Sequence, residues 1–198
     1  MKEYLIHRGT RQDLKEMEWA EIDVPMWGGS YGITARARLC WDENALHVQL
    51  AAQEQNIRAE NSSPLQEPCE DSCLELFFCP DPGDLRYFNV EYNPVGLLFL
   101  GLGTGVHDLV RLYPLDADPF TFESQYTKDG WQISYSIPHS FVRRFFPGYE
   151  PYAGLAIRGN FYKCGDKTKD RHFLAWNPVP EQGHTFHAPE SFGRFLFI

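Results

Sequence analysis

Apolar and polar residues alternate with a period of two along much of the chain. In ITARARLCW (residues 33–41) every second residue from Ile33 to Trp41 is apolar, and LHVQLA (46–51) repeats the pattern. The residues DENA (42–45) between these runs are typical of a turn. Because side chains alternate between the two faces of a strand, the pattern predicts a β-hairpin with one buried and one exposed face.

Further strand-like runs follow at short intervals, separated by turn residues. They are CLELFFCP (73–80), YFNVEYNPVG (87–96), FTFESQYTKDGWQISYSI (120–137), AGLAIRGNFYK (153–163), HFLAW (172–176) and GRFLFI (193–198). Helical patterns occur only near residues 11–18 and 138–146. Many short strands separated by Pro and Gly indicate an all-β fold, which we predict to be a two-sheet antiparallel β-sandwich, jelly-roll-like, with few short helices.

The domain organisation follows from length and continuity. The 198 residues suit one domain, and no repeat or low-complexity linker divides them. We therefore predict a single domain over residues 1–198. Residues 1–25 lack a clear strand pattern, and they are predicted to pack as an irregular N-terminal arm with Trp19 as its anchor.

Charge and composition narrow the function. A net charge of −9 argues against nucleic acid and against anionic membranes, because both require clustered Lys and Arg. No apolar run is long enough to cross a bilayer, and no signal peptide is seen, so a cytoplasmic protein is expected. An exported protein is the alternative if a leader precedes this sequence. Five scattered Cys, an odd number, favour reduced thiols.

Two of the predicted strands carry rows of polar side chains on one face. One row contains Arg158, Asn160 and Tyr162, and another runs from Asn89 to Glu91 and Asn93. Amide, guanidinium and carboxylate groups match sugar hydroxyls, which both donate and accept hydrogen bonds. Aromatic rings stack on the apolar C–H face of a sugar. A polar row that simply faces water is the alternative interpretation for each strand.

Several of these segments together resemble a known family. EDSCLELFFCPD, YFNVEYNPVG, IRGNFYKCGD, HFLAWNPV and FHAPESFGRFLF are similar to the family-nine carbohydrate-binding modules, in the branch of stand-alone family-nine-like domains. The resemblance extends from about Trp19 to the C-terminus. It implies a β-sandwich that binds a sugar without catalysis, two Trp rings that clamp the sugar, polar side chains that hold its hydroxyls, and structural calcium nearby.

The resemblance also suggests site residues. Trp176 matches the aromatic residue of the late W-[SN]-P segment, Arg158 and Asn160 lie in the strand before it, and Glu75 matches an acidic strand residue. We predict that Trp176 forms a stacking platform beside Arg158, Asn160 and Tyr162, with Glu75 and Arg86 as further hydrogen-bonding groups. The second clamp residue is expected in AENSSPLQEPCED (59–71), which has no aromatic residue. Trp27 or Tyr31 would then replace it, or the clamp is lost.

Other chemistries compete with this interpretation. Zinc could use a scattered set of residues, namely Cys164, Asp166, His172, His184 and His187, but these lack the close pairs of structural zinc sites. We predict that the 164–171 loop is a mobile connection rather than a metal site. Calcium could bind the acidic loop PDPGD (80–84), although surface solvation also explains this loop. Metal-binding residues are therefore unknown.

An enzyme and a haem-binding or interaction domain are alternatives to a sugar-binding domain. A glycoside hydrolase needs two carboxylates, and Glu75 and Glu91 are the plausible strand pair. Burial beside Cys73 and Phe77 is expected to raise the pKa of Glu75. A haem-binding or interaction domain on the same sandwich is a further alternative, although no Met lies in a predicted strand. The main prediction is a binding domain and not an enzyme. The sequence leaves the sugar and the oligomeric state open.

Overall fold

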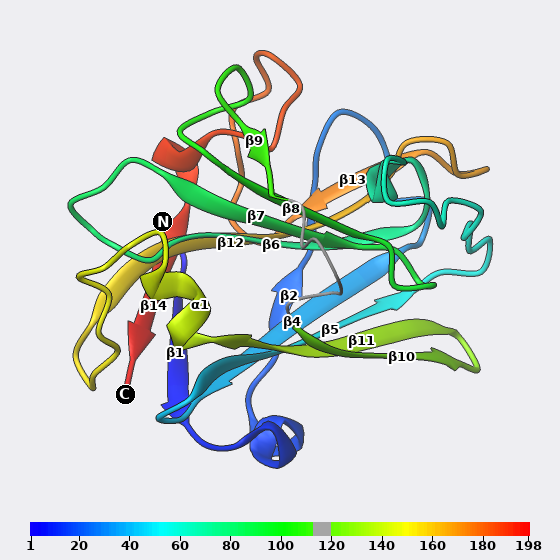
Figure 1. The fold of residues 1–198 in the computed structure, drawn as a ribbon. Coiled ribbons are helices and arrows are strands. Elements are labelled where there is room, and N and C mark those ends of the chain that lie inside the picture. The colour runs from blue at the N-terminus through cyan, green and yellow to red at the C-terminus, as the bar shows by residue number, and fades with distance from the viewer. Residues whose placement is uncertain (113–119) are drawn as a thin grey trace.

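The strands form two layers in a computed structural model that describes residues 1–112 and 120–198. In the first layer, the strands are β10 (Thr121–Thr127), β11 (Gly130–Pro138), β5 (Ala45–Gln53), β4 (Thr34–Trp41) and β2 (Ala20–Ile22). In the second, they are β14 (Gly193–Phe197), β12 (Ala156–Gly165), β6 (Cys73–Cys79), β7 (Tyr87–Tyr92), β8 (Leu98–Gly103), β9 (Val110–Arg111), β13 (His172–Ala175) and β3 (Val24–Pro25). Figure 1 shows the layers facing each other. The predicted all-β sandwich is confirmed.

Helical elements are short throughout the described residues. They are η1 (Arg11–Glu16), η2 (Pro68–Glu70), α1 (His139–Arg143) and η3 (Pro189–Ser191). Period-two sequences cannot place an apolar stripe along one side of a helix, so strands prevail. The prediction of few short helices is confirmed.

The two predicted hairpins are present with continuous registers. β4 pairs with β5 so that Leu39 lies opposite Val48. β10 pairs with β11, and Ser124 lies opposite Ile133. In both cases the turn lies where the sequence places its turn residues, because a short turn fixes the register of an antiparallel pair.

The N-terminal segment differs from the prediction of an irregular arm over residues 1–25. Its first residues form β1 (Glu3–Arg8), which pairs in parallel with β14 on one side and with β4 on the other. Tyr4 and Ile6 point into the core. The prediction is wrong because a strand completed by pairing to the distant C-terminus leaves only a weak local signal. β1 therefore joins the two layers and makes the curled sheet mixed rather than purely antiparallel.

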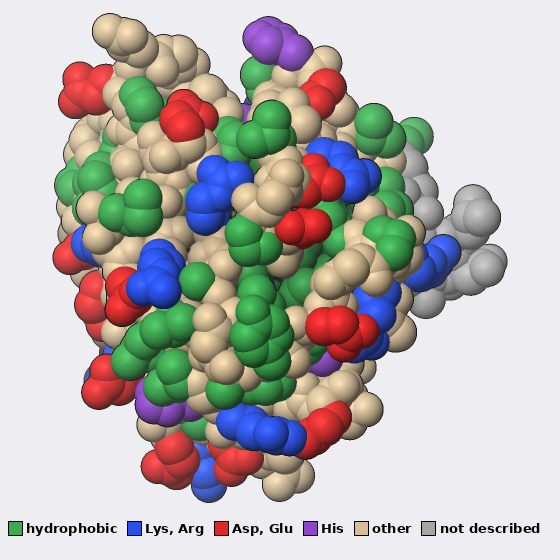
Figure 2. All heavy atoms as spheres, turned by 90° about the vertical axis from the view of Figure 1, so that its left-hand side faces the viewer, with side chains coloured by type: hydrophobic (Ala, Val, Ile, Leu, Met, Phe, Trp, Pro, Cys, Tyr) green, Lys and Arg blue, Asp and Glu red, His purple; other side chains and the backbone are tan. Residues whose placement is uncertain are grey.

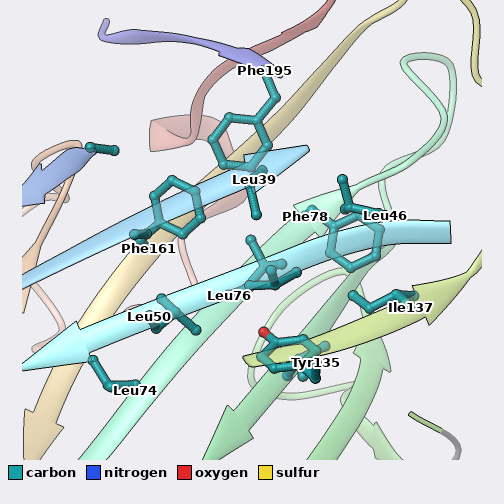
Figure 3. Close-up of a cluster of buried hydrophobic side chains, with 14 of the residues drawn as sticks. Leu39, Leu46, Leu50, Leu74, Leu76, Phe78, Tyr135, Ile137, Phe161 and Phe195 are labelled. Atoms are coloured by element: carbon teal, nitrogen blue, oxygen red, sulfur yellow. The ribbon is translucent and has the colours of Figure 1, made fainter. Parts of the chain in front are cut away.

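The core lies between the two layers. Figure 3 shows Leu39, Leu46 and Leu50 of the first layer directed at Leu74, Leu76 and Phe78 of the second. These side chains are at most 2% exposed. Phe195 and Phe197 of β14 are also fully buried in this cluster.

The surface carries mixed charge. On the side that bears β1 and β14, Figure 2 shows Lys and Arg side chains interspersed with Asp and Glu. No helix in the described part of the chain is long and apolar enough to cross a membrane.

Candidate functional site

The second layer has an outer face that points away from the first layer. We define this outer face by residues of β6, β7, β8 and β12, namely Cys73, Glu75, Phe77, Cys79, Tyr87, Asn89, Glu91, Phe99, Arg158, Asn160, Tyr162 and Cys164. Figure 1 shows the segments around β9 and before β14 rising above this layer, so loops surround the face. Polar groups of the outer face are thereby removed from bulk water.

The centre of the outer face contains two neighbouring carboxyl groups. Glu75 lies opposite Glu91 in the register of β6 and β7, and the two residues are 2% and 6% exposed. Burial raises the pKa of Glu75, and the nearby Glu91 carboxyl raises it further. Burial also raises the pKa of Glu91, to about 7. The expected rise in the pKa of Glu75 is confirmed.

Two acceptor atoms at this centre have no hydrogen-bond partner among the described residues. They are Oε2 of Glu91 and Oδ1 of Asn89. The Asn89 amide does donate to Oε1 of Glu91 over 2.9 Å, so the two side chains form one unit with its remaining oxygens unsatisfied. Buried acceptors without partners are costly, and they are common where a ligand supplies the missing donors.

One side of the outer face is bounded by a network around Asp71. This fully buried carboxylate accepts from the backbone N–H of Asn61 at 2.8 Å and from the Asn93 side chain at 2.9 Å. It also pairs with the guanidinium of Arg58. The network holds the 57–72 segment, including η2, beside β7.

Another side is bounded by residues of β8 and β9. The Arg111 guanidinium lies 4.6 Å from the centre of the Phe99 ring and pairs with Glu67 at 3.0 Å. Gly101 makes the approach of the next loop possible, because a Cβ at this position would lie 3.0 Å from the Leu109 side chain. The β8–β9 loop can therefore pack down on the sheet.

Aromatic rings form the third side. Trp27, held at a positive φ of 47°, lies 4.9 Å from Phe186 and 5.5 Å from Phe173 between ring centres. Phe186 in turn stacks on Tyr162 at 4.1 Å. The indole N–H of Trp27 is a buried donor without a partner among the described residues. An unpaired donor therefore lies in this aromatic wall, and unpaired acceptors lie at the centre of the same face.

Trp176 does not form the predicted platform. Its ring is 4% exposed and packs on Phe161 and Phe195, at 5.7 and 5.6 Å between centres. It reaches so far inward that a Cβ on Gly193 would lie 2.3 Å from the indole. The position at the end of β13 suggested a loop side chain, but the indole points toward the core between the layers. The prediction of an exposed platform is therefore wrong.

The predicted polar row on β12 is buried and internally satisfied. Asn160 donates to the Tyr162 hydroxyl and to the Asn177 carbonyl, and it accepts from the backbone N–H groups of Phe161 and Asn177. Tyr162 donates to the carbonyl of Phe186. The row was expected to be open to a ligand, but the 177–192 segment folds back over it. Alternation along a strand cannot reveal such a cover.

The two predicted arginines lie apart from the centre. Arg158 is half-buried on the outer face and donates to the carbonyl of Pro189 at 3.1 Å. Arg86 precedes β7, pairs with Asp84 at 2.6 Å and lies 4.7 Å from the ring of Phe146, a core residue. Of the predicted site residues, only Glu75 belongs to the central carboxyl pair.

The charged 164–171 loop is anchored, contrary to the prediction that it is mobile. Its backbone N–H groups at Asp166 and Lys167 donate to the carbonyls of Cys69 and Glu70, and Thr168 is buried. His172 contacts Lys163 at 2.7 Å, within a buried network with Glu54. His187, one of the possible zinc ligands, instead shares a hydrogen bond of 2.6 Å with the Tyr87 hydroxyl. Cys164 instead joins Cys73 and Glu75.

The acidic loop 80–84 does not offer a calcium cage. Asp81 caps the backbone N–H of Gly83, while both carboxylate oxygens of Asp84 accept from Arg86. An arginine beside the carboxylates opposes a dication, and calcium requires six or more oxygen ligands. These residues therefore do not fit calcium.

The family is identified by comparison with known proteins. Residues 9–197 match the model of carbohydrate-binding family 9. The chain belongs to this family. A search of curated proteins found no match.

Solved structures share the fold of this chain. A candidate carbohydrate-binding protein from Bacteroides uniformis is 25% identical, with a TM-score of 0.85 over 100% of this chain and 99% of the other. A family 9 module from Caldicellulosiruptor kristjanssonii in complex with glucose is 15% identical, with a TM-score of 0.72 over 100% and 96% of the chains. A family 9 module from the same organism in complex with cellotriose is also 15% identical, with a TM-score of 0.71 over 99% of this chain and 93% of the other. The last two likenesses establish the fold alone.

The two aromatic residues considered as clamp replacements lie in different places of this family 9 domain. Trp27 belongs to the aromatic wall of the outer face. Tyr31 is 64% exposed and lines a separate open cavity of about 400 Å³ with Gln53 and Asn56. Of the two, only Trp27 therefore packs on the outer face, at its β13 side.

Sequence reasoning missed part of this arrangement. Asn89 and Glu91 were recognised as a polar row, whereas Phe99 and Arg111 were not considered. Phe99 could have been predicted from the sequence, because a hairpin formed by β7 and β8 places Phe99 opposite Glu91. Arg111 follows a loop whose path has no local signal.

Proposed function

We propose that this protein binds carbohydrate on the outer face of its second layer, around Glu91 and Asn89, and does not cleave it. The single observation that carries this proposal is a pair of buried acceptors beneath surrounding loops, Glu91 Oε2 and Asn89 Oδ1, to which no group in residues 1–112 or 120–198 donates. Membership of carbohydrate-binding family 9 supports the ligand class.

A sugar has the chemistry that this face lacks. Its hydroxyls donate to the unsatisfied oxygens and can accept from the indole N–H of Trp27. The rings of Trp27 and Phe99 offer apolar surface for its C–H groups. Arg111 adds a planar donor beside Phe99. The oxygens lie at the centre of the outer face, Phe99 and Arg111 bound one side of it, and Trp27 belongs to another.

The affinity is expected to be weak. Hydrogen bonds to a sugar replace bonds to water, so each typically contributes only about 0.5 to 1.5 kcal/mol. A few such bonds with partial aromatic stacking correspond to a dissociation constant near 1 mM, or about −4 kcal/mol. Gluco-configured sugars are the first probes, because the two Caldicellulosiruptor modules are complexes with glucose and cellotriose.

Calorimetric titration against glucose, cellotriose and a wider glycan panel tests the proposal. We expect Trp27→Ala and Glu91→Gln to weaken binding at least about tenfold, or ~1.4 kcal/mol. Trp19→Ala is the matched control, because Trp19 is also half-buried but lies against Arg36 and Arg38 of the first layer. It should bind as the wild type does.

Two results would contradict the proposal. One is a folded wild-type protein that binds no member of the panel. The other is equal binding by the wild type, Trp27→Ala and Glu91→Gln, which would place the site elsewhere, for example at the Tyr31 cavity.

Glycoside hydrolysis is less well supported. Glu75 and Glu91 are direct neighbours on adjacent strands of one sheet. Hydrolases place their two carboxyl groups on opposite sides of the scissile bond. No observation favours the haem or interaction-domain alternatives. Release of reducing sugar from a glycan panel by the purified protein would overturn the non-catalytic proposal.

A further inference from the structure

Three potential metal ligands meet beneath the centre of the outer face. The thiols of Cys73 and Cys164 and a carboxylate oxygen of Glu75 all lie within 4.8 Å of one another. The residues are 0%, 2% and 2% exposed. Cys73 and Cys164 are 91 positions apart in the sequence, so no local motif announces the cluster.

The sheet register explains why the three groups converge. Cys164 of β12 lies directly opposite Cys73 of β6. Glu75 is two residues along β6 and therefore on the same face. Its Oε1 accepts from the Cys164 thiol at 2.8 Å. Two paired strands in the interior of the sheet thus hold the ligands, and such elements position a site more accurately than loops do.

The spacing is close to what a tetrahedral divalent ion requires. Zinc binds thiolate sulfur at about 2.3 Å and carboxylate oxygen at about 2.0 to 2.2 Å. In a tetrahedron those bond lengths put neighbouring ligand atoms about 3.5 to 3.8 Å apart. The 2.8 Å between the Cys164 thiol and Glu75 Oε1 would lengthen by about 0.8 Å to reach that spacing, and the other ligand atoms already lie within 4.8 Å of one another.

The charge around the cluster favours a cation. The groups that act on Glu75 include the acidic side chains of Glu91 and Asp166 and the Lys163 ammonium. Lys163 is already paired with Glu54 at 3.1 Å. Above the cluster lies half-buried Cys69, whose carbonyl is 3.7 Å from the Cys164 thiol.

We propose that Cys73, Cys164 and Glu75 form a binding site for a thiophilic divalent metal ion of the zinc class. The fourth position is taken by water or by the Cys69 thiol. Binding converts the Cys73 and Cys164 thiols to thiolates and Glu75 to its carboxylate, and it releases the protons held by these groups to solvent, with one more from Cys69 where its thiolate takes the fourth position. Thiolate sulfur selects zinc over calcium and magnesium. The site goes beyond sugar binding and does not depend on it.

The experiment uses the full chain, reduced and freed of metal with a chelator. Cobalt(II) is titrated as a spectroscopic probe, and zinc affinity is measured by competition with a chromophoric chelator. We expect one equivalent to bind, with thiolate-to-cobalt charge transfer and the visible bands of a tetrahedral ion. Cys73→Ser or Cys164→Ser should lose more than about 100-fold in affinity, because even outer-shell changes typically cost about 10- to 100-fold.

Cys79→Ser is the matched control. Cys79 is fully buried on the same face of β6 but lies outside the cluster. It should keep both the stoichiometry and the bands. The proposal is overturned if the wild type binds no cobalt or zinc, if Cys164→Ser binds unchanged, or if Cys79→Ser loses binding equally while remaining folded.

X-ray absorption of the zinc-loaded wild type avoids the risk that a variant fails to fold. We expect two or three sulfur ligands at about 2.3 Å with the remaining ligands oxygen at about 2.0 Å. A shell of oxygen and nitrogen alone would overturn the assignment. No sugar is present in any of these measurements, so their outcome is separate from that of the sugar titrations.

Discussion

The two faces of the second layer are both buried, yet they are built differently. On β12 the inner face carries Ile157, Gly159 and Phe161, which meet the first layer in a core of apolar and aromatic side chains. The outer face of the same strand carries Asn160, Tyr162 and Cys164, which are equally buried but lie under loops. A face buried against another sheet needs only side chains whose shapes fit those of the opposing sheet. Burial by loops brings backbone carbonyls and polar side chains, which must be satisfied.

The difference explains where function can arise. The inner face has no unsatisfied polar atom on β6 or β12, and any change in volume is felt by tightly packed neighbours. The outer face retains two orphan acceptors and a cluster of thiols beside a carboxyl group. Of these two faces, only the outer one therefore offers groups that a ligand could satisfy, by donating hydrogen bonds to the acceptors or by binding the thiols and the carboxyl group as a metal ion.

The largest expected effect tests the inner face. Trp176→Ala should reduce the free energy of unfolding by about 3 to 5 kcal/mol, because it leaves a cavity between Phe161 and Phe195. Urea denaturation followed by circular dichroism measures this loss. Trp176→Phe, which retains part of the ring volume, is the control and should lose less. A stable Trp176→Ala protein with selectively lost sugar binding would restore the platform interpretation.

Much of the fold could be predicted from the sequence, because apolar and polar residues alternate clearly in strands that pair with their neighbours along the chain. Ile33 to Leu50 and the 120–137 segment predicted their pairings correctly. β1 was missed because its partners are at the far end of the chain. Trp176 was assigned to the wrong face because the end of β13 gives no sign of which way the indole turns. The covering of Asn160 by the 177–192 segment depends on tertiary packing, which no strand period records.

The second effect concerns the covering loop and depends on pH. His187 lies on the outer face against Tyr87, and burial lowers its pKa to about 4. The unfolded chain, with a His pKa near 6.5, binds more protons between pH 6.5 and 4, so this residue makes stability fall as pH falls through that window. The contribution is up to roughly 3 kcal/mol.

His187→Gln should therefore remove part of the acid sensitivity. Glu75 and Glu91, whose pKa values are raised, act in the opposite direction, so the comparison is made between wild type and variant at each pH. Urea midpoints at pH 7.5 and pH 4.5 provide the data. Parallel stability profiles for the two proteins would show that His187 does not titrate in this way.

A smaller effect tests whether the β12 polar row is structural. Tyr162→Phe removes a hydroxyl that donates to Phe186 and accepts from Asn160, while keeping the ring stacked on Phe186. The expected cost is about 1 kcal/mol in stability, without a change in sugar affinity. Thermal denaturation and calorimetric titration of the same preparation separate the two. Loss of sugar affinity at unchanged stability would move Tyr162 into the binding site.

The smallest effect lies outside both faces, at Arg86. This side chain is 42% exposed and pairs with Asp84, whose pKa it helps to lower to about 2. Because the Asp84 pKa is depressed in the folded state, the pair stabilises the fold above the unfolded Asp pKa near 3.9, and this contribution is lost as pH falls toward 2. Exposure and salt screen the pair, so Arg86→Ala should cost only about 0 to 1 kcal/mol at pH 7.

Part of that cost comes from packing on Phe146, which Arg86→Lys would alter while keeping the charge. Chemical denaturation of both variants at pH 7 and pH 2.5 checks this, with the difference from wild type expected to shrink at the lower pH. Neither variant should change sugar binding, and a tenfold weakening in Arg86→Ala would place a binding surface at the end of β7 instead of on the outer face.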